Sequence, residues 1–166
     1  MSIEDDIARI KIQEQRLHFS SFTEEDAWGL GSAMRAKAAE RNLPFVIDIR
    51  IGIRPLFYTA LPGSTPENPD WVRRKVNTVY RFEAASYRVG LEYTLKGHSL
   101  DASRGIDPMN FASHGGGFPI RLASNVVGAV TVSGIPQRED HNFVVECLAG
   151  WLKTPLAEIQ LAQENL

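Results

Sequence analysis

The segment that most constrains the fold is residues 126–134, with the sequence Val-Val-Gly-Ala-Val-Thr-Val-Ser-Gly. It is rich in β-branched residues, and nearly all of its side chains are small or apolar. This composition is typical of a central strand that is buried on both faces. The segment therefore predicts a sheet that helices cover.

Other segments have the periodicity of further strands and of helices. A turn at 52–55 makes a hairpin of the first strand pair, and Ser124-Asn125 joins the second pair. Two pairs of strands separated by helices predict an α+β fold with an antiparallel sheet. The expected strands are 45–51, 56–60, 118–123 and 126–134, and the expected helices are 3–17, 24–41, 71–96 (continuous or resuming near residue 84) and one from 136 that restarts at Pro155.

Residues 61–70 contain three prolines and a glycine, which predicts a loop. The loop is too short to separate two domains, so we expect one domain over residues 1–166, with an N-terminal helix at about 1–20. Asp70 is expected to cap the helix that follows. The adjoining run Arg73-Arg74-Lys75 is interpreted as a solvated helix face.

The charge balance and the start of the chain argue against several partners and locations. The chain has 18 basic and 20 acidic side chains and a net charge of −2, so it lacks the basic balance of proteins that bind nucleic acid or anionic membranes. The acidic start at residues 1–6 is unlike a secretory signal, and no apolar run approaches the length of a membrane helix. Cys147 is the only cysteine, and its apolar surroundings predict a buried thiol. We expect a cytoplasmic protein.

The conspicuous motif is His114-Gly115-Gly116-Gly117-Phe118. Three successive glycines can present their N–H groups to an anion, with the histidine beside them as a metal ligand or proton carrier. The alternative is that the glycines only let the chain bend sharply into the next strand. The sequence leaves both interpretations open.

No recognisable catalytic constellation accompanies this loop. The nucleophile elbow that accompanies a similar loop in lipase-type hydrolases does not occur, and neither does a Walker motif. The four histidines do not have the spacing of a zinc site. Asp140-His141, near the start of the last helix, is expected to serve capping and dipole roles. We therefore expect a binding protein rather than an enzyme.

The loop, with Gly128–Gly134 and Pro136–His141 after it, resembles the haem-degrading-domain superfamily, also called GlcG-like or HbpS-like, and its branch of short uncharacterised single-domain proteins. The upstream segments 43–50, 60–66 and 71–77 fit the same branch. The resemblance implies a profilin-like, three-layer α/β/α architecture around a five-stranded antiparallel sheet. It also implies a homo-oligomer, with haem or a related tetrapyrrole as the candidate ligand.

The leading hypothesis is a homo-oligomeric protein that binds haem or another anionic cofactor. The cofactor-binding residues would be His114, Gly115, Gly116, Gly117, Phe118 and Arg104, with His114 as a ligand of haem iron and of no other metal. The glycine N–H groups would meet a carboxylate, and Phe111 and Phe118 would cover an apolar ring. Two alternatives stay open: a non-catalytic adaptor that docks partner proteins, and a small-molecule enzyme that uses His114 as a base.

Overall fold

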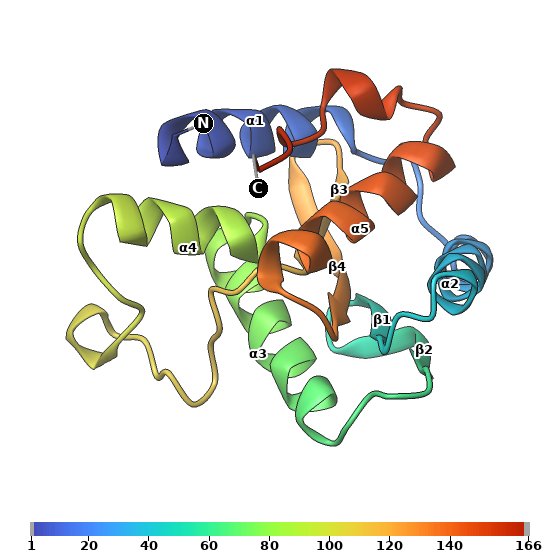
Figure 1. The fold of residues 1–166 in the computed structure, drawn as a ribbon, viewed down its shortest axis with the longest axis horizontal. Helices are drawn as coiled ribbons and strands as arrows, with labels where there is room; N and C mark the ends of the chain where they lie inside the picture. Colours follow the sequence, from blue (N-terminus) through green and yellow to red (C-terminus); the bar gives the residue numbers. More distant parts are fainter. Residues whose placement is uncertain (1, 165–166) are drawn as a thin grey trace.

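The fold is described by a computed structural model that covers residues 2–164, and it is α+β as expected (Figure 1). This part of the chain has five α-helices, four strands and two short 3-10 helices. Their order is α1 (Ile3–Arg16), α2 (Glu24–Glu40), β1 (Val46–Ile51), β2 (Arg54–Ala60), α3 (Glu67–Phe82), α4 (Ser86–Leu95), η1 (Ala102–Arg104), β3 (Gly117–Leu122), β4 (Asn125–Ser133), α5 (Gln137–Trp151) and η2 (Leu156–Glu158).

The sheet has the strand order β2-β1-β4-β3, and every neighbouring pair is antiparallel. The predicted central strand, β4, lies between β1 and β3. The expected count of five strands is wrong for residues 2–164, where the sheet has four. Beyond β3 the chain makes one isolated parallel bridge between Phe19 and Leu122. A single bridge does not extend into a strand, because the chain turns into α2 soon after Phe19.

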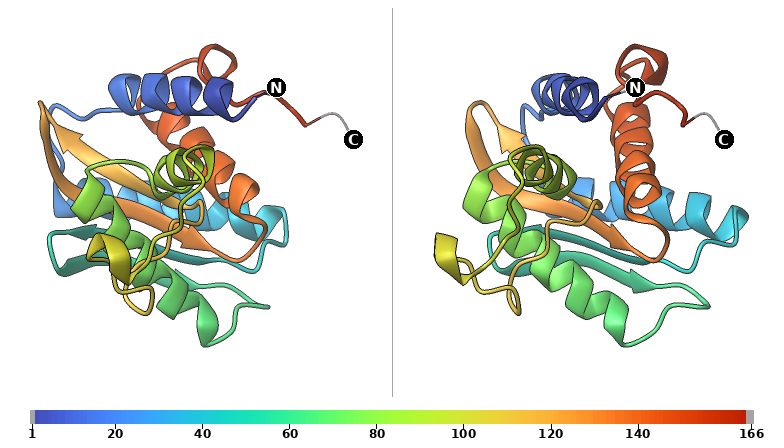
Figure 2. Two further views of the ribbon diagram at one scale, coloured as in Figure 1. Left: turned by 90° about the vertical axis from the view of Figure 1, so that its left-hand side faces the viewer. Right: turned by 60° about the vertical axis from the view of Figure 1, so that its left-hand side comes forward.

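Helices cover both faces of the sheet (Figure 2). On one face, α3 packs valines of its apolar stripe against Val46 of β1 and Ala129 of β4. On the other face, α2 and α5 cover the alternate residues of the same strands, which belong to the main core. Helix α1 lies beside α4 at the edge of this layer. Successive side chains along each strand point to opposite faces of the sheet, so a hydrophobic core forms on each face.

Two details differ from the expected pattern between the hairpins. Helix α3 begins at Glu67, so Asp70 lies inside the helix and pairs with Arg73 and Arg74 instead of capping it. The helical pattern then breaks at Glu83, whose φ of 52° is left-handed, and resumes as α4. The interpretation of residues 73–75 as a solvated face is wrong for Lys75, because its side chain is buried between α3 and α5.

Other local predictions are confirmed. Thr23 caps α2 through a reciprocal pair of hydrogen bonds with Asp26, and the chain restarts as η2 after Pro155. Cys147 is buried within the core. In the part of the chain that the structure describes, no helix combines the length and apolar character that a bilayer crossing requires.

Candidate functional site

The glycine-rich loop is held from both sides as it enters β3. The hydroxyl of Ser86, at the start of α4, donates to the carbonyl oxygen of His114 at 2.6 Å and accepts from the N–H of Gly117 at 3.0 Å. The N–H of Gly115 donates to Oε1 of Gln137, in the first turn of α5, at 3.2 Å. Two of the three glycine N–H groups therefore have acceptors inside the fold, and these two are not available to an anion.

Steric contact explains why this turn consists of glycines. Gly116 has a φ of +130°, and a Cβ atom there would lie 2.4 Å from the carbonyl oxygen of Val132 and 2.8 Å from Nζ of Lys75. A Cβ on Gly115 would lie 2.2 Å from the carbonyl oxygen of Gln137. The loop passes between β4, α3 and α5 with no room for side chains. This geometry favours the interpretation in which the glycines let the chain bend and pack closely.

His114 itself projects to the surface. Its ring makes an edge-to-face contact with Trp71 of α3, with 4.7 Å between the ring centroids. Within residues 2–164, neither ring nitrogen has a hydrogen-bond partner. Partial burial lowers the pKa of His114, and the positive charges of Lys75 and Arg74 lower it further. The imidazole is therefore neutral at pH 7, with a lone pair free to bind a metal ion or accept a proton.

A cavity of about 250 Å³ lies on the α5 side of His114. A buried ion pair forms part of its wall, with Nζ of Lys75 2.9 Å from Oδ2 of Asp140. Lys75 also donates to the carbonyl oxygen of Val132 at 3.0 Å. Burial raises the pKa of Asp140 and lowers the pKa of Lys75, against their mutual attraction. The remaining lining residues are Asn68, Trp71, Ser133, Gly134, Ile135 and Gln137.

A second cavity, of about 320 Å³, also has His114 in its wall, on the side of the irregular segment 98–113. It has a more aromatic lining, with Tyr93 of α4 and Phe111. His98 and Arg74 line it as well, so it combines a second imidazole with a cation. The two cavities thus flank one neutral, exposed histidine.

The structure brings together part of the predicted site. Arg104 lies on η1, with its guanidinium carbon 5.7 Å from the ring centroid of Tyr93, but it is not among the residues that line either cavity at His114. The predicted role of Phe118 as a cover for the ligand is wrong. Its side chain is 1% exposed and packs in the main core, so it cannot reach a ligand at the loop. Gly115, Gly116 and Gly117 are buried and serve the packing described above.

Sequence reasoning missed the contribution of α3. Trp71, Arg74 and Lys75 have the i, i+3, i+4 spacing of one helix face, and this was the available signal. Asp140 bonds outside the first turn of α5: its Oδ1 accepts the N–H of Ile135 just before the helix, and its Oδ2 binds Lys75. The capping role expected for His141 is wrong: its side chain is wholly buried, with Nε2 2.8 Å from Oε1 of Gln13, so it is a core residue.

These features define a class of protein: an α+β domain whose helix-covered antiparallel sheet supports a glycine-rich loop and a histidine-bearing pocket. The chain belongs to the family described as "Haem degrading protein HbpS-like", whose sequence model matches residues 22–149.

Relatives of similar length have similar sequences. A UPF0303 protein of Sinorhizobium medicae is 49% identical over 162 residues, which cover 97% of this chain and 99% of the relative. A UPF0303 protein of Azotobacter vinelandii is 47% identical over 167 residues, which cover 100% of this chain and 99% of the relative. The chain is therefore also a member of the UPF0303 group.

Solved structures share the fold. The crystal structure of Ybr137w protein has a TM-score of 0.80 and 30% identity, covering 89% of this chain and 87% of that chain. HbpS has a TM-score of 0.62 and 17% identity, covering 80% of this chain and 90% of that chain. A PduOC:Heme complex has a TM-score of 0.63 and 17% identity, covering 78% of this chain and 92% of that chain. At this identity, the last two structures establish the fold alone.

Proposed function

We propose that this protein binds haem or a related anionic tetrapyrrole at His114. The observation that carries the proposal is the neutral, exposed imidazole of His114 in the shared wall of two cavities. Neutral imidazole is a common protein ligand of haem iron. Membership of the HbpS-like haem-degrading family and the likeness to a structure in complex with heme support this choice.

The residues around His114 fit one edge of such a group. Tyr93 and Phe111 supply aromatic surface, and Arg74 in the wall of the second cavity supplies a cation for a propionate group. The glycine N–H groups take a smaller part than the sequence suggested, because Gly115 and Gly117 use theirs inside the fold. When bound, haem would supply a redox-active iron, while the chain would contribute the imidazole and the surrounding contacts.

The size of the site leaves part of a bound tetrapyrrole uncovered. Pockets for drug-sized ligands have volumes of about 300–1,000 Å³. The two cavities, of about 250 and 320 Å³, are at or below the low end of that range. A tetrapyrrole would extend beyond either one. Homo-oligomerisation is a separate part of the proposal, because the surface assigned to it is β2, at the opposite edge of the sheet from the strand β3 that the loop enters.

Strand β2 is the surface that we assign to self-association. It is an edge strand, and antiparallel pairing of an edge with its own copy is self-complementary about a two-fold axis. Tyr58 on this strand is 51% exposed, and Trp28 of α2, which contacts Phe57 edge-to-face, is 65% exposed. Native mass spectrometry should show an oligomer that Tyr58→Lys converts to monomer. A monomeric parent protein would overturn this part.

The domain is proposed to include α1, which precedes the residues that match the family model. The carboxylate of Glu14 accepts the N–H of Ala85 at the start of α4, and Gln13 donates to the carbonyl oxygen of Ile159. These buried contacts make α1 part of the packed unit. Limited proteolysis should leave α1 attached until the whole chain unfolds, whereas early release of residues 1–20 would contradict this.

A haem titration tests the ligand proposal. Addition of hemin to the purified protein should shift the Soret band with saturable stoichiometry, and His114→Ala should abolish the shift or weaken binding at least tenfold. His18→Ala is the matched control, because His18 lies at the end of α1 and does not line either cavity. No saturable shift, or a shift that His114→Ala leaves unchanged, would overturn the proposal.

A further inference from the structure

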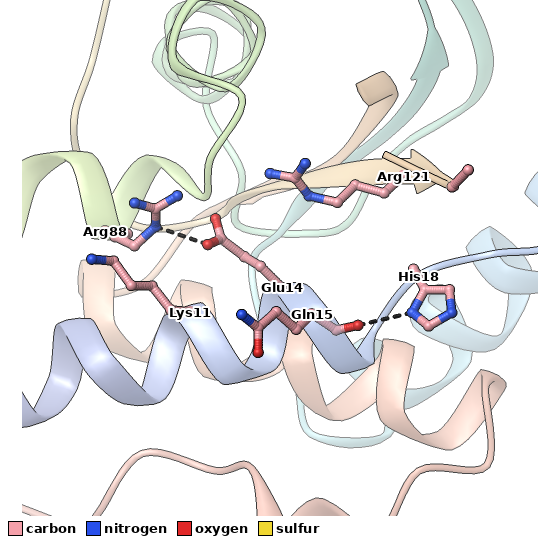
Figure 3. Close-up of a pocket in the computed structure, with 7 residues that line it drawn as sticks. Lys11, Glu14, Gln15, His18, Arg88 and Arg121 are labelled. Atoms are coloured by element: carbon pink, nitrogen blue, oxygen red, sulfur yellow. Dashed lines mark hydrogen bonds and ion pairs between the residues drawn. The ribbon is translucent and has the colours of Figure 1, made fainter. Parts of the chain in front are cut away.

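A third cavity, of about 570 Å³, lies between α1, α4 and β3 and shares no lining residue with the two cavities at His114 (Figure 3). Its wall is predominantly basic. The lining residues are Lys11, Glu14, Gln15, His18, Arg88, Arg121 and Ala123. The proposed function makes no use of this cavity.

The acidic residue of the cavity is already committed to the fold. Oε1 of Glu14 accepts the backbone N–H of Ala85 at 2.6 Å, and Oε2 lies 2.8 Å from Nε of Arg88. The Glu14 side chain is 5% exposed. Burial raises the pKa of Glu14, although the charge of Arg88 opposes this shift. Glu14 thus ties α1 to α4 and fixes Arg88 in the wall.

The basic side chains retain hydrogen-bonding capacity toward the cavity. Arg121 donates through Nη2 to the carbonyl oxygen of Glu83, and its Nε and Nη1 have no partner within residues 2–164. Nζ of Lys11 lies 3.7 Å from Oε1 of Glu92, which is too long for a hydrogen bond. Nδ1 of His18 lies 2.8 Å from the carbonyl oxygen of Gln15, which leaves Nε2 open. Several donors therefore border one space.

The charge around this cavity is positive although the whole chain is not. Three cations, Lys11, Arg88 and Arg121, face the two carboxylates of Glu14 and Glu92. The chain as a whole carries a net charge of −2. In Figure 3, the side chains of Lys11 and Arg88 lie together on one side of Glu14, and Arg121 extends above it. A locally positive, concave surface on an acidic protein indicates a small anion rather than a polyanion such as nucleic acid.

We propose that this cavity binds a small oxyanion, a carboxylate or a phosphate, between Arg121 and Lys11. The guanidinium of Arg121 keeps Nε and Nη1 as free donors on different edges of its plane, so each can donate to one oxygen of either group beside a delocalised positive charge. Lys11 supplies a mobile point charge from the opposite wall, and Arg88 holds that wall in place through Glu14. His18 borders the same space.

Isothermal titration calorimetry at low ionic strength tests this with two probes, inorganic phosphate and succinate. We expect saturable binding of one ligand per chain for at least one probe, weakened by added salt. Arg121→Gln and Lys11→Gln should each reduce affinity about tenfold, since a charge-assisted hydrogen bond is lost. The probe that binds more tightly identifies the oxyanion.

Two matched substitutions make the result specific. Arg35→Gln removes an exposed arginine on α2, and Lys96→Gln removes an exposed lysine after α4; neither lines the cavity, and both should retain the parent affinity. The absence of saturable binding by both probes, or equal weakening by the control variants, would overturn the proposal. If Arg121→Gln fails to fold, the affinity of Lys11→Gln is compared with that of Lys96→Gln, and equal affinities would overturn the proposal. Hemin binding is measured separately, because His114→Ala should leave oxyanion affinity unchanged.

Discussion

Nζ of Lys75 and Oδ2 of Asp140 lie 2.9 Å apart, and each side chain is only 3% exposed. The pair joins α3 to the first turn of α5, and Lys75 also donates to the carbonyl oxygen of Val132 on β4. One buried ion pair therefore links both helix layers to the central strand, directly beneath the glycine-rich loop.

Removing one member of this pair should cost more stability than removing both. Asp140→Ala leaves the Lys75 ammonium buried without a counterion, and we expect the free energy of unfolding to fall by about 3–5 kcal/mol. The double variant Lys75→Met/Asp140→Leu should recover much of that loss, because no charge is left unpaired. Urea unfolding of the three proteins measures this. A double variant that is no more stable than Asp140→Ala would contradict it.

Gly116→Ala should destabilise the fold by about 3 kcal/mol, because a φ of +130° is unfavourable for alanine and the new Cβ meets the backbone of Val132. Gly150→Ala is the control. A Cβ there meets nothing within 4 Å, and Gly150 lies in α5, so we expect a gain of about 0.5–1 kcal/mol. Thermal unfolding of both variants compares them. Similar behaviour of the two would show that the loop tolerates a side chain.

Stability should fall in mild acid because of His141. Burial lowers the pKa of His141 to about 3, whereas an unfolded histidine has a pKa of about 6.5. Gln13 donates through Nε2 to Ile159, so its Oε1 accepts the Nε2–H of a neutral His141. The folded state excludes the proton that the unfolded state takes up, so this contribution is complete above pH 6.5 and is lost as the pH falls toward 3.

The comparison variant is His141→Gln, which keeps a donor for Gln13 and has no titratable group. Between pH 7 and pH 5, the parent protein should lose about 2 kcal/mol more of its free energy of unfolding than this variant. Urea unfolding at the two pH values gives the difference. Equal losses would mean that His141 is already protonated, or accessible, in the folded protein.

The thiol of Cys147 should be inert in the folded protein. Burial raises the pKa of Cys147 to about 12, and the thiolate is the reactive form. The reaction with a disulfide reagent at pH 8 should be at least a hundredfold slower in buffer than in urea. Cys147 is the only cysteine, so the signal has one source. Rapid reaction of the native protein would show that α5 opens locally.

Local pattern predicted most of the elements. The β-branched residues of β4 predict a central strand, and the acidic residues after Thr23 predict the start of α2. The break at Glu83 was not predictable as a sharp end, because a left-handed glutamate carries no local signal that distinguishes it from a helical one. The fifth strand was expected from family resemblance alone, and no strand-like segment was assigned to it.

For the candidate site, the order of residues alone places a histidine before three glycines at the start of a strand. Tertiary structure decided what surrounds them: Lys75 and Asp140 are 65 residues apart in the chain, and Phe118 turned into the core rather than toward the pocket. The physical reason is that helical and strand periodicity report which face of an element is apolar, whereas the meeting of charged side chains depends on how distant elements pack.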